Sequence, residues 1–348
     1  MLQIDGSYGE GGGQILRTSL SLAAITGQPI RIDRIRSGRK KPGLAIQHLT
    51  AVRAAAKICR AELAGDAVGS TTLEFKPTVS PQPGQYKFDV AETTGAGSAG
   101  AIMLILQTIL LPLALSSGNS HVTLRGGTHV PWSPPATYIE QVYLPTVQQM
   151  GVQAEMQLQA WGWYPQGNGE VALEITGSQT PLQGLEVLER GKLKQVQGLA
   201  VVTELPAHIP QRMASRAYNL LQQAQLRADV QPLRARGIAP GAGMFLTAEY
   251  QHSRAGFSGI GKVGLAAEKV AEMAVQEFLA FQATGAPIDV HLADQLLLPA
   301  ALAAEPSQYR VAEVSLHLTT NAWVIEQFGL AQVAIAPDTQ IVTITPNR

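Results

Sequence analysis

The stretch LQIDGSYGEGGGQILRTSLSLAAITGQPIRIDRIR, residues 2–36, predicts a short strand, a glycine loop, a helix and a second strand. Gly27 follows the helix, where a glycine commonly forms the C-cap. The same order returns between residues 86 and 127 as YKFDV, TTGAGSAG, a long apolar helix and HVTLRGG. A terminal hairpin, AQVAIAPDTQIVTITP, turns at its Pro-Asp pair. The two comparable units suggest an internal duplication in a mixed α/β (α+β) fold.

The length and hydrophobic content allow more than one domain. The chain has 348 residues, of which 45% are hydrophobic, so one large or two ordinary domains can form packed cores. From about Gly184 the pattern changes to GLAVVTELP, FLTAEYQHSRAGFSG and AAEKVAEMAVQEFLAF. We therefore expect a core of residues 1–183 and 287–348, with an inserted α+β domain at 184–286.

Charge and cysteine content exclude several kinds of function. The 26 basic and 26 acidic residues give zero net charge, so a nucleic-acid contact requires a local basic patch. Cys59 is the single cysteine, which excludes an intrachain disulfide and a multi-cysteine metal site. MLQIDGSYG has no signal-peptide pattern, and the apolar run 101–115 is shorter than the roughly 20 residues of a membrane helix. We expect a cytoplasmic protein without a membrane partner.

The segment EVSLHLTTN, residues 313–321, contains a histidine beside a predicted helix start. Its apolar and polar residues alternate, which predicts a strand with His317 pointing away from the core. Residues 319–321 offer N-cap side chains for the helix that follows. Free NH groups at such a start attract anions, so His317 is either a surface histidine or a nucleophile held against a phosphate.

The glycine loop GEGGG, residues 9–13, lies between a strand and a helix, where phosphate cradles occur. It is not a Walker A loop, and Gln14 occupies the third glycine position of a dinucleotide-binding motif. Glu10 would repel phosphate unless a divalent cation bridged the two. The functional reading is a metal-binding carboxylate, and the alternative is a loop whose glycines only form a tight turn.

A basic segment follows in RIDRIRSGRKKPG, residues 31–43. Its arginines and lysines suit a phosphate, although a solvated loop is the plainer interpretation. Gln47 and His48 lie close by, near the start of the next predicted helix. Gln107 interrupts an apolar helix and needs a partner, either a backbone group or a ligand. Asp294, followed by Gln295, either caps a helix or contacts a metal or nucleotide.

Other catalytic patterns are missing. No HExxH motif or histidine pair at helical spacing indicates a zinc site. Ala96 occupies the first glycine position of a Gly-x-Ser-x-Gly elbow, so serine hydrolase chemistry has little support.

Five segments together resemble the RNA 3′-terminal phosphate cyclase family: DGSYGEGGGQILRTSLSLAAITG, IRSGRKKPGLAIQHLTAV, GAGSAGAIMLILQTILLPL, HLADQLLLPAAL and SLHLTTN. The resemblance runs from Asp5 to about Val324 in the family's order. It implies a core of repeated βαβαββ-type units, related in architecture to enolpyruvyl transferases, with a smaller inserted domain.

The resemblance also implies an activity. The histidine matching His317 would attack the α-phosphate of ATP and form a histidine-AMP intermediate. AMP would then pass to an RNA 3′-phosphate, and the 2′-hydroxyl would close a 2′,3′-cyclic phosphate. The implied cofactors are ATP and a divalent cation, Mg²⁺ or Mn²⁺, and the implied partner is RNA with a 3′-phosphate end. A homodimer is an open alternative to a monomer.

Site residues follow from the same resemblance. Glu10 matches the metal carboxylate, with Asp294 in the nucleotide and metal site. His291 stands where a tyrosine can stack on adenine. The remaining matches are phosphate clamps at Arg17, Arg36 and Arg39, pocket residues Gln47, His48 and Gln107, and the nucleotide-binding stretch His291, Leu292, Ala293, Asp294 and Gln295.

Three other functions compete with this interpretation. A non-catalytic RNA-processing or ribosome-biogenesis factor shares the fold but lacks the histidine that His317 matches. An enolpyruvyl transferase is suggested by architecture alone, which does not determine function. A nicotinamide oxidoreductase is disfavoured by the incomplete glycine motif.

Overall fold

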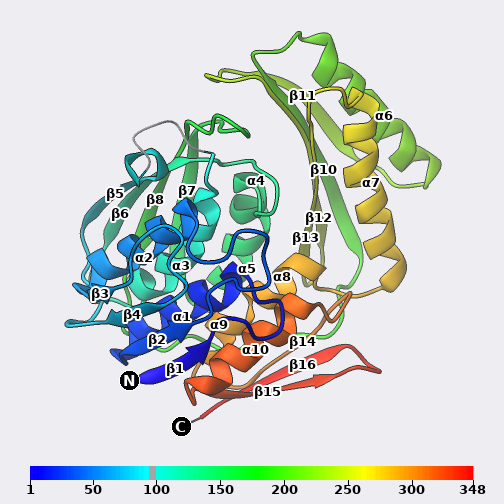
Figure 1. The fold of residues 1–348 in the computed structure, drawn as a ribbon. Coiled ribbons are helices and arrows are strands. Elements are labelled where there is room, and N and C mark those ends of the chain that lie inside the picture. The colour runs from blue at the N-terminus through cyan, green and yellow to red at the C-terminus, as the bar shows by residue number, and fades with distance from the viewer. Residues whose placement is uncertain (94–98, 348) are drawn as a thin grey trace.

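The computed structural model describes residues 1–93 and 99–347, and in this part of the chain it contains four four-stranded sheets with helices (Figure 1). Part of the predicted second glycine loop, residues 94–98, lies outside the described residues. The described helices include none with the length and apolarity needed to cross a membrane.

The first unit has the order βαβαββ. Its elements are β1 (Leu2–Asp5), α1 (Gly13–Thr26), β2 (Ile30–Asp33), α2 (Ile46–Cys59), β3 (Glu62–Ala64) and β4 (Leu73–Lys76). The strands lie in the order β1-β2-β4-β3, with β1 and β2 parallel and the other pairs antiparallel. Gly27 ends α1 at φ 71°, a left-handed conformation that glycine adopts without strain, as predicted.

The second unit repeats this topology. Its elements are β5 (Gln85–Asp89), a 3₁₀ turn (Val90–Thr93), α3 (Ile102–Ala114), β6 (Ser120–Gly126), α4 (Ala136–Tyr138), the π-helix η2 (Ile139–Tyr143), α5 (Leu144–Gln148), β7 (Gln153–Ala160) and β8 (Gly169–Thr176). The strand order β5-β6-β8-β7 has the same parallel and antiparallel relations as the first unit. The two comparable units predicted from the sequence are therefore confirmed, and their origin by duplication stays a prediction.

A third unit of the same topology closes the chain. Its elements are β9 (Glu186–Val187), α8 (Val290–Gln295), α9 (Leu297–Ala301), β14 (Ser307–Arg310), α10 (Leu316–Gln327), β15 (Ala331–Ala336) and β16 (Ile341–Pro346). The strand order is β15-β16-β14-β9, with β9 and β14 parallel. The predicted terminal hairpin is confirmed as β15 and β16.

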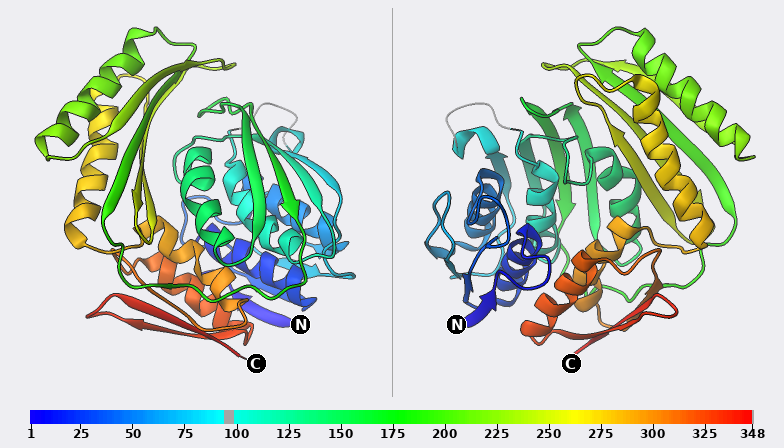
Figure 2. Two further views of the ribbon diagram at one scale, coloured as in Figure 1. Left: turned by 180° about the vertical axis from the view of Figure 1, so that it is seen from behind. Right: turned by 45° about the vertical axis from the view of Figure 1, so that its right-hand side comes forward.

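An inserted unit separates β9 from α8. It contains β10 (Leu193–Thr203), α6 (His208–Gln223), β11 (Asp229–Ala235), β12 (Gly241–Tyr250), β13 (Arg254–Ile260) and α7 (Ala267–Thr284). Helices α6 and α7 cover the sheet face that points away from the three repeats and share a separate hydrophobic cluster with it (Figure 2). The predicted limits of the insert, 184 and 286, stay a prediction.

The helices of the repeats pack together inside one large hydrophobic cluster that spans all three units. Helix α1 packs against α2, α3 and α10, and every residue of α3 except Gln107 is buried. Burying so much apolar surface drives the association of the units. As a result, α1 and α10 lie side by side although they are far apart in the sequence.

The predicted strand around His317 is wrong. Helix α10 begins at Leu316, and the hydroxyl of Ser315 accepts a hydrogen bond from the Leu318 NH at 3.2 Å as its N-cap. Three alternating apolar residues are too short a pattern to outweigh this cap. His317 therefore lies in the first turn of α10, and Thr319 to Asn321 lie within the helix and do not cap it.

Candidate functional site

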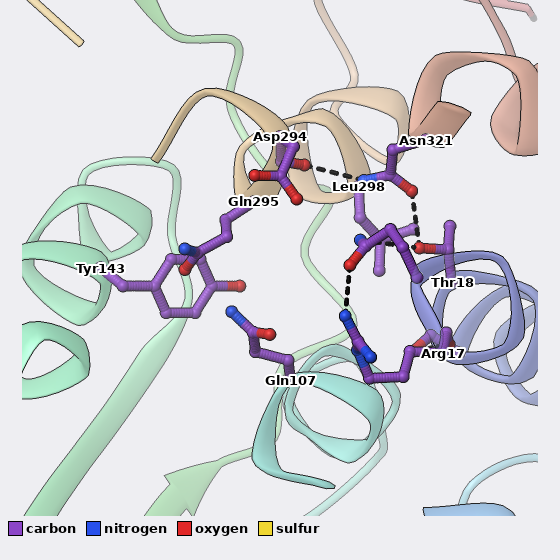
Figure 3. A pocket seen from close by; sticks show the side chains of 10 residues that line it. Arg17, Thr18, Gln107, Tyr143, Asp294, Gln295, Leu298 and Asn321 are labelled. Carbon is purple, nitrogen blue, oxygen red and sulfur yellow. Dashed lines mark hydrogen bonds between the residues drawn. The ribbon is translucent and has the colours of Figure 1, made fainter. Parts of the chain in front are cut away.

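A polar pocket lies where helices from all three units meet (Figure 3). It contains about 350 Å³ of empty space, part of it open to solvent. The lining residues come from α1, α3, η2, α8, α9 and α10 and are Gln14, Arg17, Thr18, Ser21, Gln107, Tyr143, Asp294, Gln295, Leu298 and Asn321. Of the residues predicted for the site, Arg17, Gln107, Asp294 and Gln295 are thus brought together.

Arg17 and Asp294 dominate the charge of this pocket. Arg17 keeps some exposed surface, but burial lowers the pKa of its guanidinium to about 10, so it remains charged at neutral pH. Its Nη2 donates to Gln14, and its Nε is buried with no hydrogen-bond partner among the described residues. Burial raises the pKa of Asp294 to about 7, against the opposing effects of Arg17 and His291. A partly buried cation with an unused donor suits an anionic ligand.

Asn321 ties three helices together at the pocket. Its Oδ1 accepts from Thr18 Oγ1 at 2.6 Å, and its Nδ2 donates to the Asp294 carbonyl oxygen at 2.8 Å. These bonds join α10 to α1 and α8, as Figure 3 shows. The pocket is therefore fixed by buried polar contacts as well as by apolar packing.

We predict that Asn321→Ala lowers the free energy of unfolding by about 1–3 kcal/mol, because the Thr18 hydroxyl and the Asp294 carbonyl lose their buried partner. The shift in the urea midpoint measures this loss. Asn347→Ala is the matched control, since the exposed Asn347 amide also donates to a carbonyl, at 2.9 Å. Equal midpoints for the two variants would contradict the assigned role of Asn321.

The glycine loop lies against α10. The Glu10 NH donates to Thr320 Oγ1 at 3.0 Å, and the Tyr8 ring stacks on Trp323 with centroids 4.1 Å apart. A Cβ on Gly9, at φ 54°, would come within 2.2 Å of Thr320 Oγ1, so this position requires glycine. The loop is thereby held on the helix that contains His317.

Glu10 provides one available carboxylate oxygen. Its Oε1 forms an ion pair with Arg39, whereas Oε2 is buried without a partner among the described residues. Across residues 1–93 and 99–347, no group of three or more histidine, cysteine, aspartate and glutamate side chains could hold a metal ion. Mg²⁺ bound with a nucleotide commonly takes one or two protein carboxylates together with phosphate oxygens. The donor set at Glu10 therefore fits a nucleotide-bound cation.

His317 lies beside cations. Its side chain is exposed in part, yet burial, followed by the charges of Arg17, Arg39 and His291, lowers the pKa of its imidazole below the usual 6.5. The ring is therefore neutral at pH 7, the form of histidine that acts as a nucleophile.

His48 lies beside Arg17. A Cβ on Gly13 would come within 2.5 Å of His48 Nε2 and 2.8 Å of Arg17 Nη1, which shows how closely the loop, α1 and α2 approach. The Nδ1 of His48 accepts from the Ala45 NH at 3.2 Å, as part of the start of α2. Burial, then Arg17 and Arg36, lowers the pKa of His48 to about 3, so this ring is also neutral.

The remaining predicted residues on the first unit are held by backbone contacts or by acidic neighbours. Gln47 accepts from the Ala101 NH at 3.1 Å and links α2 to the start of α3. Arg36, at φ 53°, donates to the Gly43 carbonyl at 2.7 Å.

Ion pairs occupy other arginines of the basic segment 31–43. Arg31 pairs with Asp33 and Glu74 at 3.1 Å, and Arg34 pairs with Asp5. The basic segment is therefore divided by ion pairs and is not one free patch.

The HLADQ stretch forms helix α8, and the capping role considered for Asp294 is wrong. Asp289 caps this helix, and Asp294 lies in its last turn because α8 begins five residues earlier than a cap at Asp294 would allow. Leu292 and Ala293 are fully buried in the main cluster and present no side chain to the pocket. His291 is exposed, and its hydrogen bond to Glu277, 3.2 Å away, raises its pKa to about 9.

Sequence reasoning missed several pocket residues. Thr18 and Ser21 are polar positions among several in α1, and only the structure shows that they line the pocket. The sequence indicates Asn321 only as a cap candidate. No sequence pattern marks Tyr143, which reaches the pocket only through the packing of the second unit on the third.

Comparison with known proteins gives consistent matches. The family model for RNA 3′-terminal phosphate cyclase matches residues 8–335. A protein of that name from Nostoc punctiforme is 65% identical over 344 residues, covering 99% of each chain. Another from Trichormus variabilis is 65% identical over 348 residues, covering 100% of each chain. The enolpyruvyl transferase NikO from Streptomyces tendae covers 100% of this chain and 83% of its own at 12% identity, but the TM-score of 0.21 is too low to support an inference.

Proposed function

Because this chain belongs to the RNA 3′-terminal phosphate cyclase family, a family of enzymes, we propose that it converts an RNA 3′-phosphate end to a 2′,3′-cyclic phosphate with ATP. The observation that supports this most is His317, a neutral imidazole in the first turn of α10 beside Arg17 and Arg39. A neutral nucleophile next to fixed cations suits attack on a phosphate, whose negative charge the cations offset.

In the first step, the unprotonated ring nitrogen of His317 attacks the α-phosphorus of ATP. A nitrogen–phosphorus bond forms, the bond to the bridging oxygen breaks, and pyrophosphate leaves. The other ring nitrogen then releases its proton to solvent, so the imidazole ring of the phosphoramide carries no charge. Arg17, Arg36 and Arg39 would contact the phosphate oxygens, where a guanidinium can bind two oxygens at once.

In the second step, a 3′-phosphate oxygen of RNA attacks the phosphorus of the bound AMP. The nitrogen–phosphorus bond breaks while the other ring nitrogen takes up a proton from solvent, which returns His317 to its neutral form and leaves an RNA-adenylate. In the third step, the neighbouring 2′-hydroxyl loses its proton and attacks the RNA phosphorus. AMP departs, and a 2′,3′-cyclic phosphate remains. Dividing the reaction supplies a good leaving group to a phosphate that otherwise lacks one.

The nucleotide would occupy the pocket of Figure 3. Gln107, Asp294 and Gln295 line it, and Gln295 Oε1 is buried without a partner among the described residues. His291, with Leu292 and Ala293 behind it, would contact the adenine base. Gln47 and His48 would line the part of the site that holds the phosphates. Glu10 and Asp294 would hold Mg²⁺ or Mn²⁺, which when bound neutralises phosphate charge. A cytoplasmic location and a homodimer stay predictions.

An RNA oligonucleotide with a 3′-phosphate tests the activity directly. Incubation with ATP and a divalent cation should give an end that resists phosphatase and opens in mild acid. The same RNA without ATP, or an RNA with a 3′-hydroxyl, should remain unchanged. Product formation without ATP would contradict the proposed function.

We predict that the rate of the first step, followed as the pH is lowered, falls to half its maximum only below pH 6.5. Burial and two neighbouring arginines disfavour the imidazolium of His317, so its folded-state pKa is below 6.5 and the reactive neutral form persists as the pH falls through that value. Single-turnover label transfer from ATP to the protein measures the profile. Asp294→Asn serves as a control, because the carboxyl that it replaces has a pKa of about 7. A half-maximal rate at or above pH 6.5 in both proteins would contradict the assignment.

A further inference from the structure

Asp289 connects helix α8 to the inserted unit. It is 1% exposed and lies at the junction between α7 and α8. Its Oδ1 accepts from the NH groups of His291 and Leu292, both at 2.9 Å, and so caps α8. Its Oδ2 accepts from the Gly256 NH of β13 at 3.3 Å. One buried carboxylate thus joins the nucleotide-pocket helix to the inserted sheet.

Tyr138 completes this junction from the second unit. Its hydroxyl donates to both Asp289 oxygens, at 2.9 and 3.1 Å. A Cβ on Gly256 would come within 2.5 Å of the Tyr138 ring, so the strand passes directly over the aromatic ring. Three parts of the molecule therefore meet at Asp289: β13 of the insert, α4 of the second unit and α8 of the third.

Glu277 forms a second link between the inserted unit and α8. Its Oε1 lies 3.2 Å from His291 Nε2, and its Oε2 accepts from the Ser258 NH at 3.5 Å. Helix α7 and strand β13 thus both reach the same helix. Because α8 also contains Asp294 and Gln295, a displacement of the inserted unit would be transmitted to the pocket.

We propose that the inserted unit positions helix α8 for nucleotide binding through Asp289 and Glu277, so that ATP binding and docking of the inserted sheet are energetically coupled. This inference rests on the proposed function, in which α8 contributes to the ATP site. Coupling between two sites is reciprocal: if docking of the insert favours ATP binding, ATP binding stabilises the docked insert. Asp289 is in this account a positioning residue that acts through α8.

Asp289→Asn separates the two roles of the carboxylate. The amide oxygen can still accept from the His291 and Leu292 NH groups, since asparagine is a good N-cap. The amide nitrogen replaces Oδ2 and meets the Gly256 NH, another donor, so the link to β13 is lost. Glu277→Gln is the second variant, because it removes the charge that pairs with His291. Arg212→Gln is the matched control, since the Arg212–Glu268 ion pair at 2.8 Å lies within the inserted unit, between α6 and α7.

The experiment measures binding of an ATP analogue with a methylene group between the α- and β-phosphates, which blocks the first chemical step. We expect Asp289→Asn to weaken this binding about 10-fold, within the usual range of coupling between sites. The KM for ATP should rise while the KM for RNA stays unchanged. Hydrogen exchange should show that the analogue slows exchange in residues 254–260 of the wild type and of Arg212→Gln, but not of Asp289→Asn.

The outcomes separate the two proposals. The coupling is refuted, and the proposed function stands, if Asp289→Asn and Glu277→Gln both bind the analogue as well as the wild type does and the analogue slows exchange in residues 254–260 of these variants as it does in the wild type. If the wild type does not bind the analogue at all, the proposed function fails and this inference fails with it. Weakened binding with lost protection in folded Asp289→Asn supports the coupling.

Discussion

Replacing His317 with alanine should reduce cyclisation of a 3′-phosphate RNA by at least about 10⁴-fold, because the proposed intermediate cannot form without a nucleophile. The side chain lies in the first turn of α10 and is exposed in part, so its removal should leave the fold unchanged. Initial rates with saturating ATP and RNA measure the effect. Thermal unfolding of the same preparation verifies that the variant is folded.

His121→Ala is the matched control for this prediction. His121 is 61% exposed on β6, beside Glu174 at 3.9 Å, and lines no part of the pocket. Its replacement should leave the rate within twofold of wild type, as expected for a surface change. A His317→Ala variant that keeps more than a few per cent of wild-type activity would exclude the covalent histidine route.

Arg17→Met should slow the first chemical step by about 10²–10³-fold, as is typical when one preorganised contact to developing charge is removed. Arg17 places a partly buried positive charge in the pocket, with Nε unused among the described residues. Arg17→Lys should retain an intermediate rate, since an ammonium keeps the charge without the two-pronged geometry. Single-turnover label transfer from ATP to the protein measures all three rates.

The loss of Arg17 should also raise the pKa of Asp294. Arg17 holds the pKa of Asp294 down against burial, so the methionine variant should have an Asp294 pKa above the present value of about 7.

Arg53→Met is the control for the rate of the Arg17→Met variant, because Arg53 is exposed on α2 and pairs with Asp66 at 3.4 Å. Equal single-turnover rates for Arg17→Met and Arg53→Met would rule out Arg17 as a phosphate contact.

The first two repeats could be predicted from the sequence because each has a strand, a glycine loop and a long apolar helix in the same order. The third could not. Its first strand, β9, has two residues, and the whole inserted unit separates it from α8. A repeat interrupted in this way loses the fixed spacing by which repeats are found in a sequence.

The site could be predicted in part for similar reasons. Glu10 and Gln107 are polar groups in glycine-rich or apolar surroundings, which the sequence displays directly, whereas Arg17 is predicted only from the family resemblance. The alternating pattern around His317 predicts a strand and does not reveal Ser315 as the cap of α10. The catalytic role of His317 stays a prediction. The contribution of Glu277 depends on the docking of α7 against α8, a tertiary contact between separate units that no local pattern encodes.

Incubation of the wild type with ATP labelled at the α-phosphate and a divalent cation, without RNA, tests the histidine-AMP intermediate most directly. The account predicts an acid-labile label that survives denaturing electrophoresis and maps to the peptide containing His317. Well-folded protein that takes up no label with either Mg²⁺ or Mn²⁺ would contradict it.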